Sequence, residues 1–129
     1  MHLALKLFIE VDENFAVGPG RIELLRSVRE LGSLLQASKK MGMSYRWAWG
    51  RLKKTEEILG IPLLTKCAKG ALGRPNNLTP EAEELLEWYS QAEDSLKNVL
   101  GRIEADMPES LAGRILPLEN ETMGTTDPE

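Results

Sequence analysis

The chain has very little of the chemistry on which disulfide and metal sites depend. Its 129 residues include one cysteine, Cys67, and one histidine, His2. A single cysteine excludes a disulfide within the chain, and a single histidine leaves no cluster of ligands for zinc. We therefore expect no metal site built from cysteine and histidine, and no cofactor.

Long hydrophobic runs are also missing. No apolar stretch approaches the roughly 20 residues that span a bilayer. The N-terminal run MHLALKLFIEVDE lacks the basic start and the small-residue cleavage site of a signal peptide. We therefore expect a soluble, cytoplasmic protein without a membrane partner. With 42% hydrophobic residues, the chain can bury the core of one small domain with an extension, but not two cores.

Groups for catalysis are equally sparse. A nucleophile needs a neighbouring base, and Cys67 has no imidazole partner in the sequence. The acidic residues near the C-terminus follow a pattern typical of a solvated helix face. We therefore expect that the protein is not an enzyme.

Basic and acidic residues are segregated along the chain. The whole sequence carries 16 Lys and Arg against 20 Asp and Glu, a net charge of -4. Residues 20–80 contain twelve basic and four acidic residues, a net charge of +8, whereas residues 1–19 carry -2 and residues 81–129 carry -10. Neutralisation of phosphates supplies most non-specific affinity for nucleic acids, so residues 20–80 favour DNA. A solvated basic face is the alternative.

The first elements are a predicted strand and a helix. Residues 2–11 alternate apolar and other side chains, which predicts a half-buried strand, and a loop is expected over residues 12–20. Pro19 can open a helix because its missing N–H costs nothing there, and Gly32 ends it. The apolar positions of this helix are Ile22, Leu25, Val28 and Leu31.

Two further helices are predicted around a tight turn. Ser33 lies three residues before Gln36, which is the capping-box signature of a short second helix. Gly42 ends that helix and permits a sharp turn. Ser44 then caps a third helix that runs to about Leu59. Its buried stripe is predicted to consist of Ala48, Leu52, Thr55 and Leu59, with Tyr45 beside them.

The opposite face of the third helix is basic. Its outward stripe contains Arg46, Gly50, Lys53, Lys54 and Glu57. A glycine lets the backbone approach base edges and an arginine can donate twice to guanine, so this face suits a major groove. A solvated amphipathic helix is the alternative. We expect Trp49 to pack against the first helix, whereas core packing and DNA contact are both open for Trp47.

A hairpin wing is predicted after the third helix. Pro62 prevents the helix from continuing through residues 61–66, and a glycine-containing turn over residues 69–74 leads into residues 76–78. The basic residues Lys66, Lys69 and Arg74 would reach phosphates or an adjacent minor groove. An ordinary basic loop is the alternative.

A long helix is predicted to close the fold. Thr79 caps it, and Pro80 occupies its first position. Apolar residues recur along it with gaps of three and four, at Ala82, Leu85, Tyr89, Ala92, Leu96, Val99 and Ile103. Such a seam can dock on its own domain, but the helix is longer than so small a domain can cover, so we favour a homodimer.

Together these elements predict a mainly α fold with a small β component. We expect a winged helix-turn-helix DNA-binding domain over residues 1–79, a dimerisation helix over residues 80–105 and a flexible tail over residues 106–129.

The sequence also resembles a known family. The run EVDENFAVGPGRIELLRSVRELGSLLQASKKMGMSYRWAW is similar to the N-terminal DNA-binding domain of ModE-type molybdate-responsive transcriptional regulators, through its initial strand, its GPGRIELL entry and its MSYRWAW segment. The same stretch, continued through LGIPLLTK and LTPEAEELL, is similar to the LysR-type winged helix. The resemblance covers about residues 2–100. It implies that Ser44, Tyr45, Arg46, Gly50 and Arg51 lie on a recognition helix and that residues 66–74 form the wing.

Full-length ModE-type regulators carry C-terminal molybdate-binding domains, and LysR-type regulators carry a large effector domain. Only a short tail follows the long helix here, so the resemblance extends to DNA binding and dimerisation, and molybdate binding stays open. We expect a homodimeric, sequence-specific regulator that binds double-stranded DNA. The alternative is a helix-turn-helix module for protein interaction or dimerisation. The candidate DNA-contacting residues are Ser33, Ser44, Tyr45, Arg46, Trp47, Gly50, Arg51, Lys53, Lys54, Lys66, Lys69 and Arg74.

Overall fold

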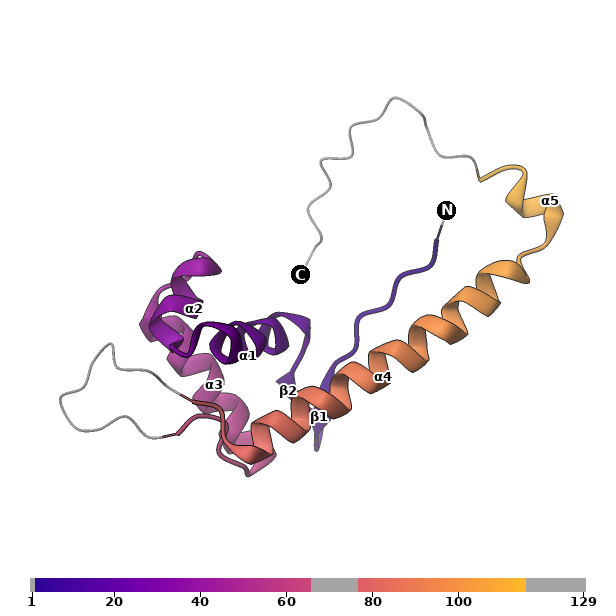
Figure 1. Cartoon of the computed structure of the whole chain (residues 1–129). Coiled ribbons are helices and arrows are strands. Elements are labelled where there is room, and N and C mark those ends of the chain that lie inside the picture. Colours follow the sequence, from indigo (N-terminus) through magenta and orange to yellow (C-terminus); the bar gives the residue numbers. More distant parts are fainter. Residues whose placement is uncertain (1, 66–76, 116–129) are drawn as a thin grey trace. The chain divides into compact units, whose positions relative to one another are not determined.

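A computed structural model describes residues 2–65 and 77–115 of the chain (Figure 1). The chain divides into two compact units. One consists of Leu5–Ser95, and the other consists of Met1–Ala4 together with Leu96–Glu129. The larger unit contains every helix and strand up to the first half of the long helix, and it holds the hydrophobic core.

The larger unit begins with a two-stranded hairpin. Strands β1 (Ile9–Val11) and β2 (Asn14–Val17) pair antiparallel. The prediction of one strand over residues 2–11 followed by a loop was therefore wrong in its bounds, since β2 lies in the predicted loop. A strand requires a hydrogen-bonded neighbour, and in the described structure only the last three residues of the predicted strand have one.

Helix α1 follows the predicted bounds, and α2 begins where predicted but ends at Lys40, before Gly42. Helix α1 spans Pro19–Leu31 and ends at Gly32, whose φ of 71° is left-handed and suits a residue without a Cβ atom. Helix α2 spans Leu34–Lys40, and the Ser33 hydroxyl caps it by accepting a hydrogen bond of 3.2 Å from the Gln36 N–H. The predicted start of the short second helix is thus confirmed.

Helix α3 spans Tyr45–Leu59 and begins after a tight turn. Its Ser44 cap is confirmed, because the Ser44 hydroxyl accepts a hydrogen bond of 3.1 Å from the Trp47 N–H. The inward stripe is confirmed too: Ala48, Leu52 and Thr55 are buried, and Leu59 is half-buried. Helix α3 therefore turns one face to the core and the other to solvent.

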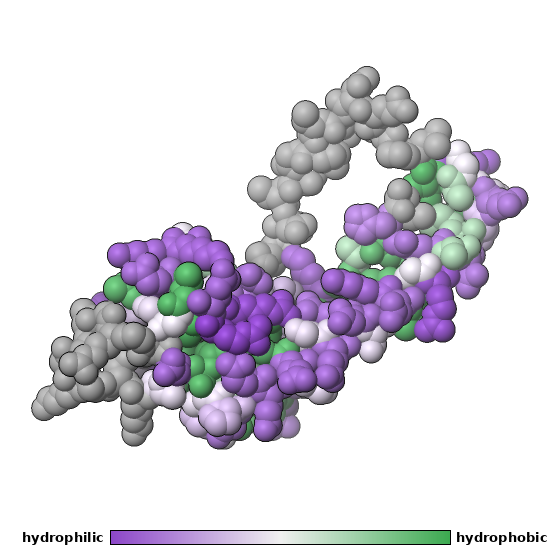
Figure 2. All heavy atoms as spheres, viewed as in Figure 1, coloured by the Kyte–Doolittle hydropathy of each residue, from purple (hydrophilic) through white to green (hydrophobic). Residues whose placement is uncertain are grey.

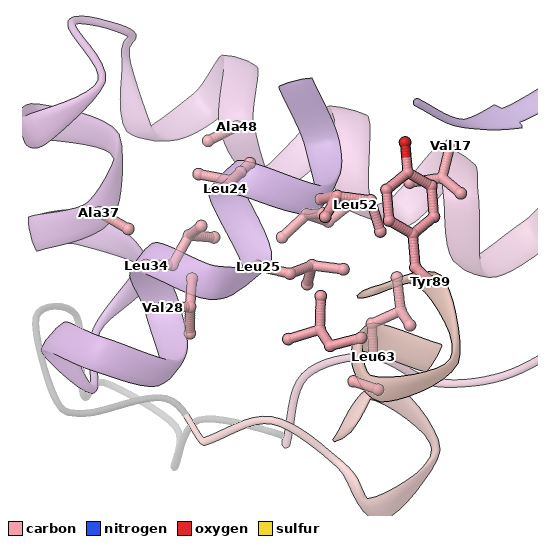
Figure 3. Packing of buried hydrophobic residues seen from close by; sticks show 13 residues of the cluster. Val17, Leu24, Leu25, Val28, Leu34, Ala37, Ala48, Leu52, Leu63 and Tyr89 are labelled. Atoms are coloured by element: carbon pink, nitrogen blue, oxygen red, sulfur yellow. The ribbon is translucent and has the colours of Figure 1, made fainter. Parts of the chain in front are cut away.

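The core of the larger unit is assembled from all of these elements and from α4, which spans Pro80–Ala105 (Figure 3). Burying one valine, leucine or isoleucine side chain contributes about 1.5–3 kcal/mol to the free energy of folding relative to leaving it exposed. The completely buried apolar residues of α1, α2 and α3 pack against one another, and Leu63 and Tyr89 complete the same cluster. This packing fixes α3 on the domain.

The first half of α4 docks on the larger unit. Thr79 caps it as predicted, accepting a hydrogen bond of 3.1 Å from the Ala82 N–H. Ala82, Leu86 and Tyr89 are buried in the core. Two members of the predicted dimer seam, Ala82 and Tyr89, therefore belong to the domain's own core and cannot also face a partner copy.

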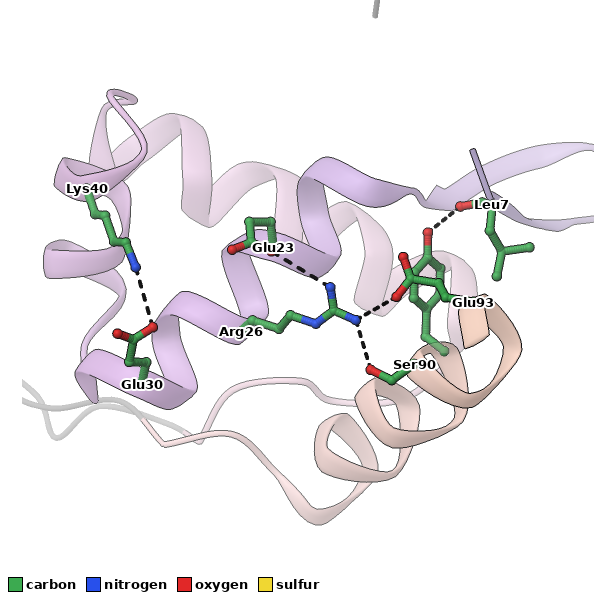
Figure 4. Close-up of polar contacts among 8 residues, drawn as sticks. Leu7, Glu23, Arg26, Glu30, Lys40, Ser90 and Glu93 are labelled. Atoms are coloured by element: carbon green, nitrogen blue, oxygen red, sulfur yellow. Dashed lines mark hydrogen bonds and ion pairs between the residues drawn. The ribbon is translucent and has the colours of Figure 1, made fainter. Parts of the chain in front are cut away.

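Polar contacts reinforce this docking (Figure 4). One guanidinium nitrogen of Arg26 on α1 lies 2.8 Å from both the Ser90 hydroxyl and a Glu93 carboxylate oxygen on α4. The Tyr89 hydroxyl donates a hydrogen bond of 2.5 Å to the Leu7 carbonyl, which ties the N-terminal segment to α4. Helix α4 is thus held through its first four turns.

The smaller unit contains the second half of α4 and the short helix α5 (Glu109–Ala112). The predicted tail over residues 106–129 therefore begins with a helical turn, and residues 116–129 lie outside the described part of the chain. Leu3 donates its backbone N–H to the Glu104 carboxylate. Hydrophobic side chains gather over the end of α4 and over α5 (Figure 2), where Val99, Ile103, Leu111 and Ile115 are exposed. No described helix has both the length and the apolar character needed to cross a bilayer.

Candidate nucleic-acid interface

The outward face of α3 is the basic surface that the sequence predicts. Arg46, Gly50, Lys53, Lys54 and Glu57 are all exposed. At Gly50 an added Cβ atom would meet no atom within 4 Å, so the backbone of α3 is open to solvent there. The stripe thus combines cations with a bare stretch of backbone.

These cations differ in how far they are already neutralised. Lys53 lies 3.2 Å from a Glu56 carboxylate oxygen. Within residues 2–65 and 77–115, Arg46, Arg51 and Lys54 form no ion pair. Two of these cations, Arg46 and Lys54, therefore lie on the outward stripe of α3, and Arg51 lies half-buried on its flank.

Two tryptophans flank this stripe. Trp49 was predicted to pack against the first helix, but 45% of it is exposed, so that prediction was wrong. The reason is that Ala48 and Leu52 already fill the interface of α3 with the core. Trp47 is 53% exposed, so of the two alternatives left open for this residue, packing in the core is not supported. A cation one turn further along α3 lies over each indole. The Arg51 Cζ atom is 3.7 Å from the centre of the Trp47 ring, and the Lys53 Nζ atom is 5.2 Å from the centre of the Trp49 ring.

The remaining predicted contact residues are at the helix starts. Ser33 is only 7% exposed and its hydroxyl serves as the cap of α2, so it is not available for contact with DNA. Ser44 is exposed, and its hydroxyl caps α3. Tyr45 is half-buried and packs against the core. The start of α3 is therefore firmly held beside Arg46.

The base of the predicted wing is present. Leu64 and Leu78 form an antiparallel bridge, Thr65 donates to the Asn77 carbonyl at 2.9 Å, and Thr79 donates to the Leu63 carbonyl at 3.0 Å. Two segments of the chain thus run side by side after α3, joined by one bridge. Lys66, Lys69 and Arg74 lie outside the described residues.

Glu56 ties α3 to this base, a role that the sequence did not reveal. One of its carboxylate oxygens accepts hydrogen bonds from the Leu63 N–H at 2.7 Å and the Leu64 N–H at 3.3 Å. Burial alone would raise the pKa of Glu56, but these bonds and Lys53 outweigh it and hold the pKa below its ordinary value. Glu56 is therefore an ionised anchor for the strand that enters the wing.

Arg21 on α1 lies beside one flank of α3, at Thr55, and sequence reasoning missed it. Its Nη1 atom donates to the Ala16 carbonyl at 2.7 Å and to the Thr55 hydroxyl of α3 at 3.0 Å. Its guanidinium lies 4.6 Å from the Phe15 ring. The pKa of Arg21 is lowered, mainly because the side chain is partly buried and in second place because the positive charge of Arg51 is near. No pattern of spacing joins residues 34 positions apart, so only the fold places Arg21 beside α3.

Comparison with known proteins agrees with this architecture. The sequence profile described as "Bacterial regulatory helix-turn-helix protein, lysR family" matches residues 20–83. The chain is 34% identical over 87 residues to the "Transcriptional regulator ModE" of Haemophilus influenzae, covering 67% of this chain and 34% of that protein. It is 29% identical over 91 residues to the "Molybdenum-pterin-binding protein MopB" of Rhodobacter capsulatus, covering 70% and 34%. The chain thus spans about a third of the length of these relatives.

Solved structures share the fold. The DNA-binding domain of CbnR, solved as a DNA complex, matches with a TM-score of 0.54 at 20% identity, over 69% of this chain and 97% of that one. The DNA-binding domain of BenM, solved with benA site 1 DNA, matches with a TM-score of 0.52 at 20% identity, over 67% and 94%. The predicted mainly α winged-helix fold with a long C-terminal helix is thereby confirmed. The chain carries a LysR-type helix-turn-helix domain at residues 20–83, and its relatives include regulators named ModE.

Proposed function

We propose that this protein is a transcriptional regulator that binds a specific double-stranded DNA sequence as a homodimer, with α3 in the major groove. The observation that carries the proposal is the outward face of α3. Arg46 and Lys54 are exposed there, form no ion pair in the described residues, and lie on either side of the bare backbone at Gly50. A polyanion with a groove wide enough for a helix fits this face.

Arg46 is the residue best placed to read a base. In helix-turn-helix domains the first residues of the second helix usually reach base edges. Arg46 is the second residue of α3, its helix start is fixed by the Ser44 cap, and its side chain is exposed. Since a guanidinium donates two hydrogen bonds to the O6 and N7 atoms of guanine, we assign Arg46 to base recognition.

The relatives support the same class of function. The matching solved domains were crystallised with DNA, and several relatives are named as transcriptional regulators. By analogy the basic wing residues Lys66, Lys69 and Arg74 contact the phosphate backbone. The relative MopB is named for molybdenum-pterin binding, but the chain matches only 34% of its length. Molybdate sensing therefore stays outside the proposal.

The homodimer rests on the second half of α4. Ala92 and Leu96 are half-buried, and Val99 and Ile103 are exposed apolar residues that continue the predicted seam. A seam of this kind pairs with its own copy about a two-fold axis. Two symmetric recognition helices would then read inverted half-sites separated by about one or more helical turns of DNA.

One observation favours the second candidate function, a protein-interaction module. Trp47 and Trp49 are exposed on the two flanks of the basic stripe of α3, and aromatic residues are enriched at protein interfaces. Lys53 and Lys54, which lie between them, favour DNA, because lysine is depleted from protein interfaces and neutralises phosphates.

Selection of bound fragments from genomic DNA, followed by titration on the selected site, tests the proposal. Arg46→Ala should weaken binding to the preferred site by about 1–3 kcal/mol and remove the preference at one base pair. Arg114→Ala is the matched control, because Arg114 is exposed in the smaller unit. If the wild type binds all fragments alike and Arg46→Ala changes nothing, α3 does not read DNA and the interaction module is favoured.

A further inference from the structure

Two arginines from different helices meet on one flank of α3. Arg21 comes from α1 and donates to the Thr55 hydroxyl at 3.0 Å, and Arg51 lies one helical turn before Thr55 on α3. The charge of Arg51 reaches Arg21, since it is the second cause, after burial, that lowers the pKa of Arg21. The two positive charges are therefore near neighbours.

Each guanidinium is held in place by contacts that leave donors free. Arg21 makes both of its hydrogen bonds through Nη1 alone, and it lies 4.6 Å from the Phe15 ring. Arg51 lies 3.7 Å from the Trp47 ring, which is a stacking contact that uses none of its N–H groups. Preorganised guanidiniums lose less side-chain entropy when they bind an anion.

The pair lacks an anion within the described structure. No carboxylate of residues 2–65 or 77–115 forms an ion pair with Arg21 or Arg51. Like charges held close together repel, and an anion that binds both relieves the repulsion. The arrangement thus has the composition of an anion site: two fixed cations, free donors and no counter-charge.

Position on α3 decides which group of DNA this site faces. At about 100° per residue, Arg51 lies toward Thr55, on the flank of the helix, whereas Arg46 and Gly50 lie on the outward stripe. A helix in the major groove turns its outward stripe to the bases and its flanks to the walls of the groove, which are sugar and phosphate. The flank position therefore favours phosphate over bases.

We propose that Arg21 and Arg51 together bind one phosphodiester of the DNA backbone, and that Trp47 is the positioning residue that holds Arg51 in line. This inference rests on the proposed DNA binding, and it gives Arg51, until now a candidate contact residue without a defined role, the role of phosphate clamp. It also adds Arg21 to the DNA-contacting surface.

The test uses duplexes in which single phosphates are replaced by neutral methylphosphonates, one at a time. Wild-type protein should lose affinity most at one phosphate facing this flank. Arg51→Ala should lose on the order of threefold to tenfold on every sequence. It should become less sensitive to that replacement, with only Arg21 left at the phosphate, and the slope of log affinity against log salt should shrink by about 0.9 for each half-site. Base preference should be unchanged.

Companion variants separate positioning from folding. Trp47→Leu keeps the charge, so it should weaken binding without changing the salt slope, and it should add nothing when combined with Arg51→Ala. Arg51→Lys should restore the slope but only part of the affinity. Arg21 is not substituted, because its bonds to Ala16 and Thr55 support the fold. Arg114→Ala is the control for loss of one positive charge.

Two results would overturn the inference. Arg51→Ala could flatten the preference at one base pair while keeping every methylphosphonate penalty, which would make Arg51 a base reader. It could also change nothing, which would make it a solvated surface cation. If the wild type binds no DNA, the proposed function fails. Titration of the protein with dimethyl phosphate then shows whether Arg21 and Arg51 still form an anion site. Shifts in the Nε–H NMR signals of both arginines would keep the anion site, and no shift would remove it.

Discussion

At the scale of single residues, Thr55 shows how a polar group can occupy an apolar position. It lies on the predicted inward stripe of α3 and is completely buried. A buried hydroxyl costs free energy unless it is hydrogen-bonded, and Thr55 donates to the Ala16 carbonyl at 2.5 Å and accepts from Arg21. Ala16 is free to accept because it is the extra residue of a β-bulge: Ile9 pairs with Val17 and Glu10 with Phe15.

The hairpin turn is a second feature at this scale. Asp12 and Glu13 have φ values of 50° and 66°, the left-handed pair typical of a type I′ turn, in which glycine is preferred at the second position. We predict that Glu13→Gly raises the free energy of unfolding by about 0.5–1 kcal/mol, because it removes the steric cost of a left-handed side chain. Thermal or urea unfolding measures the change.

Glu10→Gly is the matched control for that substitution. Glu10 lies in β1 of the same hairpin and has no positive φ, so the glycine there should lower stability. Equal effects of the two substitutions would show that the turn is not strained.

At the scale of elements, the helices could be predicted well because their signals are local. Pro19, Gly32, Ser44 and Gly60 mark helix ends through their own backbone or side-chain chemistry, and each does so in the structure. The inward stripe of α3 followed from periodicity alone. What depends on a partner far along the chain could not be predicted in this way.

Three differences illustrate this limit. The first strand is Ile9–Val11 rather than the predicted residues 2–11, because a strand is defined by pairing with a neighbour and not by alternation of side chains. Trp49 stayed exposed because smaller residues fill the core side of α3. The seam of α4 is divided because Tyr89 packs into the domain. In the candidate site, Arg46 and Lys54 were predictable from the helical wheel, whereas Arg21 and Glu56 act through contacts that only the folded chain makes.

The link between α3 and the base of the wing gives an element-scale prediction. The pKa of Glu56 is lowered in the folded state, so its contribution to stability is complete above the ordinary value of 4.5 and disappears as the pH falls through the folded value. We predict that Glu56→Gln is less stable than wild type at about pH 6, and that the difference narrows below 4.5. Urea unfolding across this pH range measures it.

The neighbouring residue provides the control for this prediction. Glu57 is exposed, so Glu57→Gln should match the wild type at every pH. A difference between Glu56→Gln and wild type that stays constant down to about pH 3 would contradict the ionised anchor.

At the scale of the whole molecule, charge distribution matters more than net charge. Residues 20–80 carry +8 and residues 81–129 carry -10, so the total of -4 hides two opposite fields. A DNA duplex is attracted to the first region and repelled by the second. The proposed DNA binding therefore belongs to residues 20–80 rather than to the acidic C-terminal region.

The proposed homodimer gives the prediction at this scale. Ile103 is exposed on the seam of α4, so Ile103→Lys should leave the monomer folded but place a charge twice in a symmetric interface. We expect the wild type to have a dimer mass at micromolar concentration by light scattering and the variant to have a monomer mass. Asn98→Lys, on another face of α4, should remain dimeric. A monomeric wild type would remove the dimer from the proposal.

The exposed tryptophans have a consequence for spectroscopy. The chain has three tryptophans, and Trp47, Trp49 and Trp88 are 53%, 45% and 55% exposed. Because no indole is sheltered in the core, the native protein should already fluoresce at the long wavelengths of hydrated indole, and unfolding should shift the emission little. Two of the three fluorophores lie on α3, where stacking against nucleic acid or exclusion of water would change their yield. Intrinsic fluorescence of this protein should therefore report occupancy of the α3 face rather than loss of the fold.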